Sequence, residues 1–250
     1  MTVSGPENAA PILTIRNLKK SFGENTVLTG FNLTVNKGEN VVVLGRSGTG
    51  KSVLIKCIVR LIDPDDGEIN VLGKEILKLD PEPLDVMRAR IGFLFQSSAL
   101  YDSMTVEENL EFPLRRHLRK HIKYDVEKLV KDALESVRLD GTQKMSPAEL
   151  SGGMRKRIGI ARTLILNPEV MLYDEPTTGL DPITAREINH LMLEVQEKFK
   201  TTSIIISHDM NCVRMTANRV VVLIEGKCYA EGSYDDLKKS QDKHVKQFFD

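Results

Sequence analysis

The sequence Gly45-Arg46-Ser47-Gly48-Thr49-Gly50-Lys51-Ser52 lies between the apolar run 41–44 and a segment whose apolar residues recur at helical spacing. A strand, a glycine-rich turn and a helix form the setting in which the pattern G-x-x-x-x-G-K-[ST] has a physical meaning. Glycines allow successive backbone N–H groups to approach a phosphate closely, and the helix start adds unpaired N–H groups and the positive end of its dipole. The alternative, a glycine-rich turn with a chance lysine, leaves this setting unexplained. We therefore expect the turn to bind a nucleoside triphosphate, with Lys51 on the outer phosphates and Ser52 placed to ligate Mg²⁺.

Length and composition favour one large domain, or a domain with a subdomain. The chain has 250 residues, and 35 Lys and Arg balance 35 Asp and Glu. A formal net charge of zero and the absence of tryptophan argue against a nucleic-acid-binding surface, so no nucleic acid is expected as a partner. The three cysteines include no C-x-x-C pair, which argues against disulfides and zinc and fits a reducing compartment. No apolar run is long enough to span a bilayer.

The hydrophobic pattern predicts a mixed α/β domain over residues 12–250, after a flexible polar tail over residues 1–11. Alternating apolar residues between 12 and 35 predict a small antiparallel sheet, with a turn at 19–23. Apolar residues at helical spacing over 105–139 predict a helical insert. Near the C-terminus we expect a hairpin over 220–230, followed by a terminal helix that ends at Phe249.

Polar side chains follow three predicted strands. Gln96 follows the strand 91–95, Asp174 and Glu175 follow the strand 170–173, and His208 follows the strand 203–207. Each one alone could be an ordinary residue at a strand end. Parallel strands place their carboxyl ends at one edge of a sheet, where α/β proteins bind ligands. The coincidence therefore favours a functional site, in which two carboxylates form the acidic half of a nucleotide-hydrolysing centre.

A second anion-binding helix start is predicted at Ser151-Gly152-Gly153. Ser151 can cap the helix, and two glycines in its first turn cost helix stability, which indicates a close backbone approach. An ordinary capped helix is the alternative. Because this helix start follows the helical insert, a role across an interface fits it better than a role beside its own Lys51.

Two further features leave alternatives open. Phe22 is either a loop aromatic packed on its neighbours or a platform on which a nucleobase stacks. The basic segment 115–123 reads first as a solvated face, and otherwise as a docking surface for a partner or for anionic lipid headgroups. His117 and His121 have the i, i+4 spacing of metal ligands, but no carboxylate or third histidine lies beside them in the sequence.

From Ile12 onward the chain resembles the nucleotide-binding domains of ABC transporters, whose motifs occur here in the family's order. Lys51 lies in the Walker A loop, Gln96 in the Q-loop, Leu150–Met154 forms the signature, and Asp174-Glu175 ends the Walker B strand. Gly179-Leu180-Asp181 matches the D-loop and His208 the switch histidine. The family's signature usually ends in Gln, where this chain has Met154.

The resemblance implies a P-loop NTPase fold with a RecA-like parallel core sheet, an N-terminal antiparallel β-subdomain and an α-helical subdomain inserted at about 98–157. It implies an ATP hydrolase with ATP and Mg²⁺ as cofactors, working as a head-to-tail homodimer. Glu175 would be the general base, His208 would contact the γ-phosphate, and Gln96 and Lys51 would complete the catalytic group. Mg²⁺ would be held by Ser52, Gln96 and Asp174. ATP would be held by Phe22, stacked on adenine, and by Gly45, Arg46, Ser47, Gly48, Thr49, Gly50, Lys51, Ser52, Ser151, Gly152, Gly153 and Asp181, the signature residues acting on the partner's nucleotide.

Three segments also resemble the ATP-binding subunits of Mla-type phospholipid transporters, which work with MCE proteins. These segments are the phosphate loop 45–52, the run 91–106 and Leu-Ser-Gly-Gly-Met-Arg-Lys-Arg at 150–157. This resemblance implies integral-membrane permease partners, MCE-domain and STAS-domain accessory proteins, and a peripheral position on the cytoplasmic face of the inner membrane. Transport of another substrate, such as an amino acid or a metal chelate, is the alternative, followed by a non-transport ABC ATPase.

Overall fold

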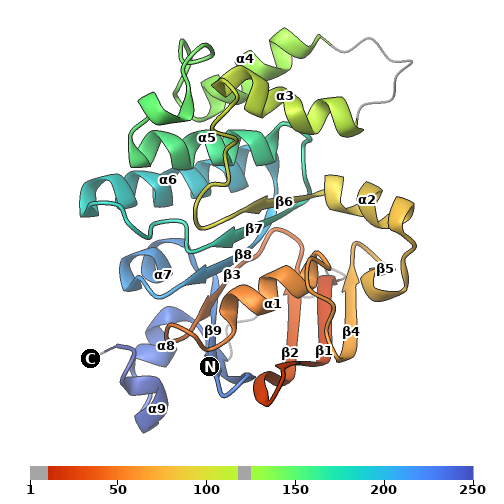
Figure 1. The fold of residues 1–250 in the computed structure, drawn as a ribbon. Coiled ribbons are helices and arrows are strands. Elements are labelled where there is room, and N and C mark those ends of the chain that lie inside the picture. Colours follow the sequence, from red (N-terminus) through yellow and green to blue (C-terminus); the bar gives the residue numbers. More distant parts are fainter. Residues whose placement is uncertain (1–10, 118–124, 250) are drawn as a thin grey trace.

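The computed structural model describes residues 11–117 and 125–249. Its centre is a six-stranded sheet in the order β10-β9-β3-β8-β7-β6, of which β9 to β6 are labelled in Figure 1. Neighbouring strands from β9 to β6 are parallel, and only β10 runs antiparallel, against β9. The parallel part confirms the predicted core sheet. The strands are β3 (Asn40–Leu44), β6 (Ile91–Leu94), β7 (Val170–Asp174), β8 (Thr202–Ser207), β9 (Arg219–Ile224) and β10 (Lys227–Gly232).

A second, antiparallel sheet has the order β2-β1-β4-β5 and confirms the predicted N-terminal β-subdomain. Its strands are β1 (Pro11–Phe22), β2 (Asn25–Asn36), β4 (Asp66–Val71) and β5 (Lys74–Glu75). The turn predicted at 19–23 is wrong, because β1 continues through Phe22 and turns at Gly23, whose φ is +59°. Lys19 and Lys20 extend the strand by pairing with Asp66 and Asp65 across the sheet.

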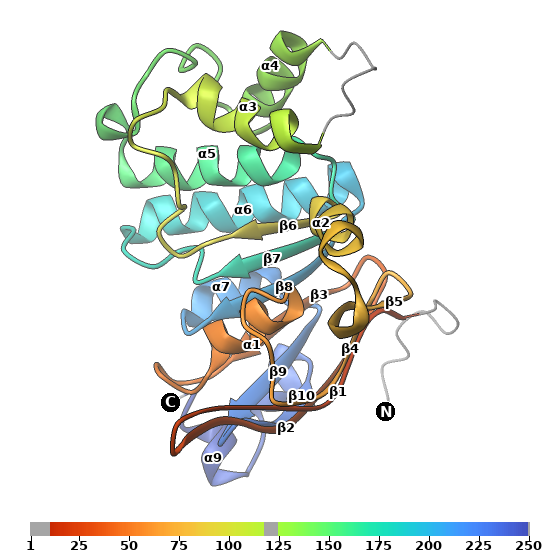
Figure 2. The same ribbon diagram turned by 45° about the vertical axis from the view of Figure 1, so that its right-hand side comes forward.

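Helices cover both faces of the central sheet (Figure 2). Within the described residues they are α1 (Lys51–Ile58), α2 (Pro81–Ala89), α3 (Val106–His117), α4 (Val126–Ser136), α5 (Gly152–Leu164), α6 (Pro182–Phe199), α7 (Met210–Thr216), α8 (Tyr234–Lys238) and α9 (Lys243–Lys246), with 3-10 turns at Ile76–Lys78 and Pro147–Glu149. None of these helices is long and apolar enough to cross a membrane.

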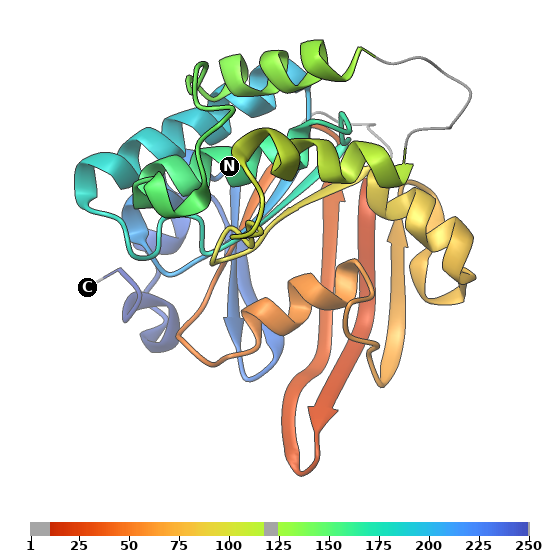
Figure 3. The ribbon, with the colours of Figure 1, turned by 45° about the horizontal axis from the view of Figure 1, so that its top comes forward.

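Alternate residues of the central strands feed two separate hydrophobic cores. Val41 and Val43 of β3 pack in a core with α1 and the antiparallel sheet, which is red to orange in Figure 3. Val42 and Leu44 face the opposite core, which contains α3 to α7. This period of two reflects the alternation of side chains along a strand. A strand buried on both faces reads as a continuous apolar run, which is how β3, β7 and β8 stand out in the sequence.

The predicted helical insert contains α3 and α4, which pack on α5. The predicted single terminal helix is wrong, because the chain forms two short helices, α8 and α9. Asp242 starts the second one by accepting hydrogen bonds from the backbone N–H groups of His244 and Val245. In the basic segment, Arg115 and Arg116 pair with Glu111 and Asp85. Arg119, Lys120, His121 and Lys123, and residues 1–10 of the predicted tail, lie outside the described residues. The last residue of that predicted tail, Pro11, instead begins β1.

Candidate nucleotide site

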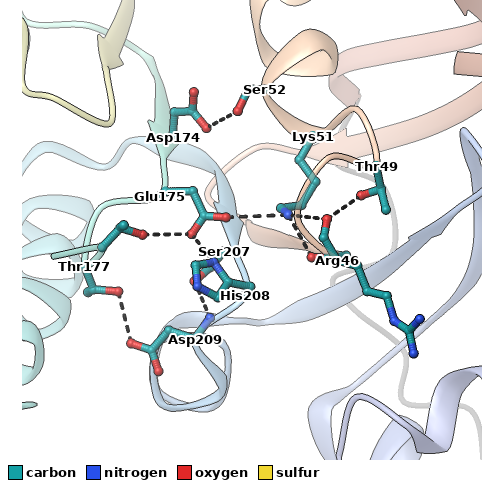
Figure 4. Close-up of polar contacts among 12 residues, drawn as sticks. Arg46, Thr49, Lys51, Ser52, Asp174, Glu175, Thr177, Ser207, His208 and Asp209 are labelled. Carbon is teal, nitrogen blue, oxygen red and sulfur yellow. Dashed lines mark hydrogen bonds and ion pairs between the residues drawn. The ribbon is translucent and has the colours of Figure 1, made fainter. Parts of the chain in front are cut away.

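A cavity of about 310 Å³ opens where the phosphate loop meets the carboxyl ends of β7 and β8 (Figure 4). Its position follows from topology, because β3, β7 and β8 are parallel neighbours and therefore end at the same edge. The sequence-predicted residues in its lining are Phe22, Ser47, Gly48, Gly50, Lys51, Ser52, Gln96, Glu175 and His208.

The phosphate loop requires glycine at position 50. Gly50 precedes α1 with a φ of +97°, a region that residues with side chains rarely adopt. A Cβ atom there would lie 2.5 Å from Cγ1 of Val27. At Gly45 a Cβ would lie 2.9 Å from the Oγ1 of Thr49, whose hydroxyl donates to the carbonyl of Arg46 at 2.8 Å. Neighbouring side chains therefore leave no room for a Cβ atom at Gly45 or Gly50, and the loop lines the cavity.

Lys51 is buried, with 5% of its surface exposed. Its Nζ donates to the carbonyl oxygens of Gly45 at 2.7 Å and Arg46 at 2.9 Å, and lies 3.6 Å from Oε1 of Glu175. The ammonium group thus lies between the phosphate loop and the end of β7. A buried cation needs such partners, and phosphate oxygens can replace them.

Ser52 and Asp174 bring a hydroxyl and a carboxylate together. Ser52 Oγ donates to Oδ1 of Asp174 at 2.9 Å. Burial raises the pKa of Asp174 above its ordinary value, while the Ser52 hydrogen bond acts in the opposite direction. Mg²⁺ prefers oxygen ligands and is usually held by one or two carboxylates together with substrate phosphates. The donor set therefore fits this ion.

Glu175 follows β7 and faces the cavity with both carboxylate oxygens engaged. Its Oε2 lies 2.7 Å from Nδ1 of His208 and accepts a hydrogen bond from the Thr178 hydroxyl at 3.2 Å. The backbone at Glu175 has a φ of +50°, a strained conformation for a residue with a side chain. The next residue after the histidine, Asp209, accepts a hydrogen bond from the Thr177 hydroxyl at 3.0 Å, so the two strand ends are connected twice.

Phe22 and Gln96 lie at the exposed side of the cavity. Phe22 has 49% of its surface exposed, and Lys20 Nζ lies 5.2 Å from the centre of its ring. The ring lines the cavity and is half exposed, which favours the stacking interpretation over that of a loop aromatic packed on its neighbours. Gln96 is exposed and comes two residues after the end of β6.

Eight predicted site residues are not in the lining of this cavity, namely Gly45, Arg46, Thr49, Asp174, Ser151, Gly152, Gly153 and Asp181. Ser151 caps α5 by accepting a hydrogen bond from the Met154 N–H. The glycines after it allow a close approach within the chain, since a Cβ on Gly153 would lie 2.5 Å from Cγ2 of Thr184 and one on Gly152 would lie 3.3 Å from Leu180. Asp181 caps α6 through the N–H groups of residues 183 and 184. Of the phosphate-loop residues, Arg46 directs its guanidinium to the side chain of Gln247.

Sequence reasoning missed Lys156. Its side chain is 5% exposed, and its Nζ donates to the backbone carbonyls of Gln96 and Glu175. The available signal was its spacing, because Lys156 lies four residues after Gly152 and three before Gly159, on the small-residue face of the helix.

Comparison with known proteins identifies the family. Residues 28–178 match the ABC transporter family. The chain belongs to this family. The matched region runs from β2 through the phosphate loop, the signature and the Walker B carboxylates.

The relatives of this ABC chain have names that refer to transport. The methionine import ATP-binding protein MetN of Brucella abortus is 39% identical over 227 residues, which are 91% of this chain and 61% of the relative. The chain thus spans about three fifths of that protein. The probable ribonucleotide transport ATP-binding protein mkl of Mycobacterium leprae is 35% identical over 251 residues, which are 99% of this chain and 72% of the relative.

A solved structure has the same fold. The ATP-binding cassette MJ0796, in a dimeric structure of a post-hydrolysis state bound to ADP and Pi, superposes with a TM-score of 0.80 and 32% identity. The match covers 88% of this chain and 98% of that one. It confirms the P-loop NTPase fold of the ABC type.

Proposed function

We propose that this ABC chain is the ATP-hydrolysing subunit of a membrane transporter. The observation that carries the proposal is the convergence, at one cavity, of the phosphate loop with Gln96, Glu175 and His208 from three other segments. A phosphate-binding loop facing a carboxylate and a histidine is an arrangement for cleaving a bound triphosphate.

The nucleotide would be bound at its base and at its phosphates. Phe22 would stack on adenine, and the backbone N–H groups of residues 45–52 would surround the β- and γ-phosphates. The ammonium group of Lys51 already donates to the carbonyl oxygen of Gly45 at 2.7 Å. When nucleotide binds, it would donate to phosphate oxygens in place of the loop carbonyls. Its contact with Glu175 would loosen in the same movement, which releases that carboxylate for chemistry.

The hydroxyl of Ser52, the amide of Gln96 and the carboxylate of Asp174 would hold Mg²⁺. When bound, the ion would neutralise charge on the phosphates. The chain's own contribution is to keep the Ser52 hydroxyl and the Asp174 carboxylate in contact at 2.9 Å.

Glu175 would accept the proton of the attacking water as general base. The contact with Nδ1 of His208 fixes the direction of the Glu175 carboxylate. His208, with 58% of its side chain exposed, would contact the γ-phosphate with its ring.

Two copies of the chain would form a head-to-tail dimer in which each signature turn closes the partner's site. Support comes from the fold, because Ser151, Gly152 and Gly153 are absent from the lining of this chain's own cavity. Gly153 approaches Thr184 of α6 and Gly152 approaches Leu180, so the signature lies near Asp181, which would link the two sites. The similar MJ0796 structure is dimeric.

The transported molecule is proposed to be a phospholipid. The support is the Mla-type sequence of three segments, 45–52, 91–106 and 150–157. Permease subunits would supply the membrane-spanning part, with MCE-domain and STAS-domain proteins as accessory partners, and this chain would lie on the cytoplasmic face of the membrane. The second candidate is import of a small solute such as an amino acid, which is favoured by 39% identity to a methionine import protein.

The ATPase proposal is tested with Glu175→Gln, which keeps the size of the side chain and removes its basicity. We expect the turnover rate to fall by roughly 100-fold or more, the range for loss of a general base, while the variant still binds ATP. Steady-state hydrolysis and nucleotide binding are measured on the purified chain. The matched control is Glu127→Gln on the exposed side of α4, which should retain the original rate. Normal turnover by the Glu175 variant would remove this residue from the role of base.

The identity of the cargo requires a separate experiment. The chain is isolated from solubilised membranes with the proteins that bind it, and the small molecules held by those proteins are identified by mass spectrometry. Phospholipids in a permease with an MCE-domain partner support the lipid proposal. An amino acid held by a permease and a solute receptor would support the second candidate instead.

A further inference from the structure

Lys156 is a buried cation outside the lining of the nucleotide cavity. It lies in the second turn of α5, and its Nζ reaches the carbonyl oxygen of Gln96 at 2.5 Å and that of Glu175 at 3.3 Å. Both of those residues line the cavity. One ammonium group therefore connects the signature helix to two segments that carry site residues.

Burying an ammonium group is costly, so a lysine is kept in such a place only where its partners compensate the loss of water. Burial lowers the pKa of Lys156, and the nearby carboxylates of Asp174 and Glu175 act in the opposite direction. No carboxylate of the described residues lies within ion-pair distance of its Nζ. The donors are thus directed at main-chain carbonyls, which points to a role in holding backbone.

The segment after Gln96 is held by α5 at two further points. Arg162 donates to the carbonyls of Ser98 at 2.9 Å and Ala99 at 2.7 Å. A Cβ on Gly159 would lie 2.7 Å from Leu94 and 3.1 Å from Ser98, so the helix touches the end of β6 directly. Residues 96–99 are therefore attached to α5 at both ends.

The backbone held in this way is strained. Ser98 and Ala99 have φ angles of +63° and +47°, and Glu175 has +50°. A non-glycine residue in this region costs on the order of 1 kcal/mol and persists only where its surroundings hold it. Lys156 and Arg162 donate to the carbonyls of all three strained residues.

We propose that Lys156 is a positioning residue, which fixes the backbone of Gln96 and Glu175 to the helix that begins with the signature turn. Through this ammonium group, the turn that faces the partner's nucleotide and the residues that act on the chain's own nucleotide share one rigid support. The inference rests on the proposed ATPase function for its kinetic consequence, and on the contacts alone for its structural consequence.

The kinetic test uses Lys156→Met, which keeps an unbranched side chain and removes the charge and the donors. We expect the turnover rate to fall by roughly 10- to 100-fold, the scale of losing alignment at a reactive centre, with KM for ATP changed by less than about threefold. Lys156→Arg keeps a cation with several donors and should recover most of the rate. The matched control is Lys128→Met on the exposed side of α4, which should behave as the unsubstituted chain.

Hydrogen exchange provides a readout that does not need catalysis. In the purified chain without nucleotide, Lys156→Met should raise amide exchange in residues 96–99 several-fold, while exchange in β8 stays the same. If Lys156→Met does not fold, Lys156→Gln, which retains a shorter amide donor, is measured in the same two ways. Unchanged exchange together with unchanged turnover overturns the inference. An unsubstituted chain that does not hydrolyse ATP would instead overturn the proposed function, and the exchange experiment would still decide the role of Lys156.

Discussion

Asp174 and Glu175, at the end of β7, each lower the stability of the fold, the first through a buried carboxylate and the second through a strained backbone. Asp174 is 4% exposed, and Glu175 has a φ of +50°. The sequence could place these two residues and His208 at one edge, because the carboxyl ends of parallel strands meet. For Lys156 it offered only the spacing from Gly152 and Gly159, because this lysine lies within an Arg-Lys-Arg run that is typical of an exposed basic stretch. The packing of α5 buries Lys156, whereas Arg155 is exposed and Arg157 is partly buried beside Glu187.

The residue scale gives a prediction about stability and pH. Because burial raises the pKa of Asp174, the folded chain binds this proton more tightly than the unfolded chain does, and the ionised carboxylate lowers the free energy of unfolding at neutral pH. Asp174→Asn retains an oxygen that can accept the Ser52 hydrogen bond and removes the charge. Without nucleotide and Mg²⁺, the variant should therefore melt at a higher temperature than the original chain at pH 7.

The sign of the pH dependence follows from the same shift. The cost of the carboxylate is absent below the unfolded pKa near 3.8 and develops as pH rises from there through the raised pKa of the folded chain. The difference in Tm between variant and original should therefore shrink on acidification. Asp102→Asn, at an exposed position, serves as the control. A variant that melts lower at pH 7 would contradict this account.

At the scale of elements, the hydrophobic pattern predicts a strand correctly where burial of apolar side chains alone determines it. β3, β7 and β8 are buried on both faces and read as continuous apolar runs, so their positions could be predicted. The boundaries that failed depend on competing local contacts. β1 is extended by cross-strand pairs of Lys19 and Lys20, and the terminal helix is divided in two by the cap of Asp242. Such contacts involve residues distant in sequence or a single side-chain oxygen, and no periodic pattern encodes them.

The contact between α5 and α6 gives a prediction at this scale. Gly153→Ala would place its methyl group 2.5 Å from Cγ2 of Thr184, whose hydroxyl is held by Asp181 at 2.5 Å and cannot turn away freely. We expect a loss of about 1–3 kcal/mol in the free energy of unfolding, the range for overpacking. Denaturant unfolding of the purified chain measures it.

Thr184→Ser isolates the cause, because it deletes Cγ2 and keeps the hydroxyl that Asp181 holds. Combined with Gly153→Ala, it should restore most of the lost stability, which a double-mutant cycle reads as a coupling energy. Purely additive effects of the two substitutions would show that the methyl group is not the source of the strain.

At the scale of the whole molecule, the C-terminal segment reaches back to the phosphate loop. Arg46 of the phosphate loop donates to Gln247, 201 residues later, and Phe248 and Phe249 pack against the core that contains α5 and α6. Nothing local in either segment predicts this contact, since both partners are ordinary exposed polar residues. The overall arrangement could be anticipated only through resemblance to a family, because the order of strands in the sheet is not written in hydrophobic periodicity.

The dimer proposal makes a prediction at this scale, with Glu175→Gln as background so that bound ATP is not consumed. Addition of ATP should double the mass in light scattering, because each signature turn closes the other chain's site. Ser151→Arg in the same chain places a bulky side chain at the exposed turn, so we expect ATP to be bound but the mass to stay that of one chain. Ser103→Arg, also exposed, is the matched control and should still dimerise. If the Ser151 variant dimerises as well, the two copies do not meet through their signature turns, and hydrolysis would have to be explained within a single chain.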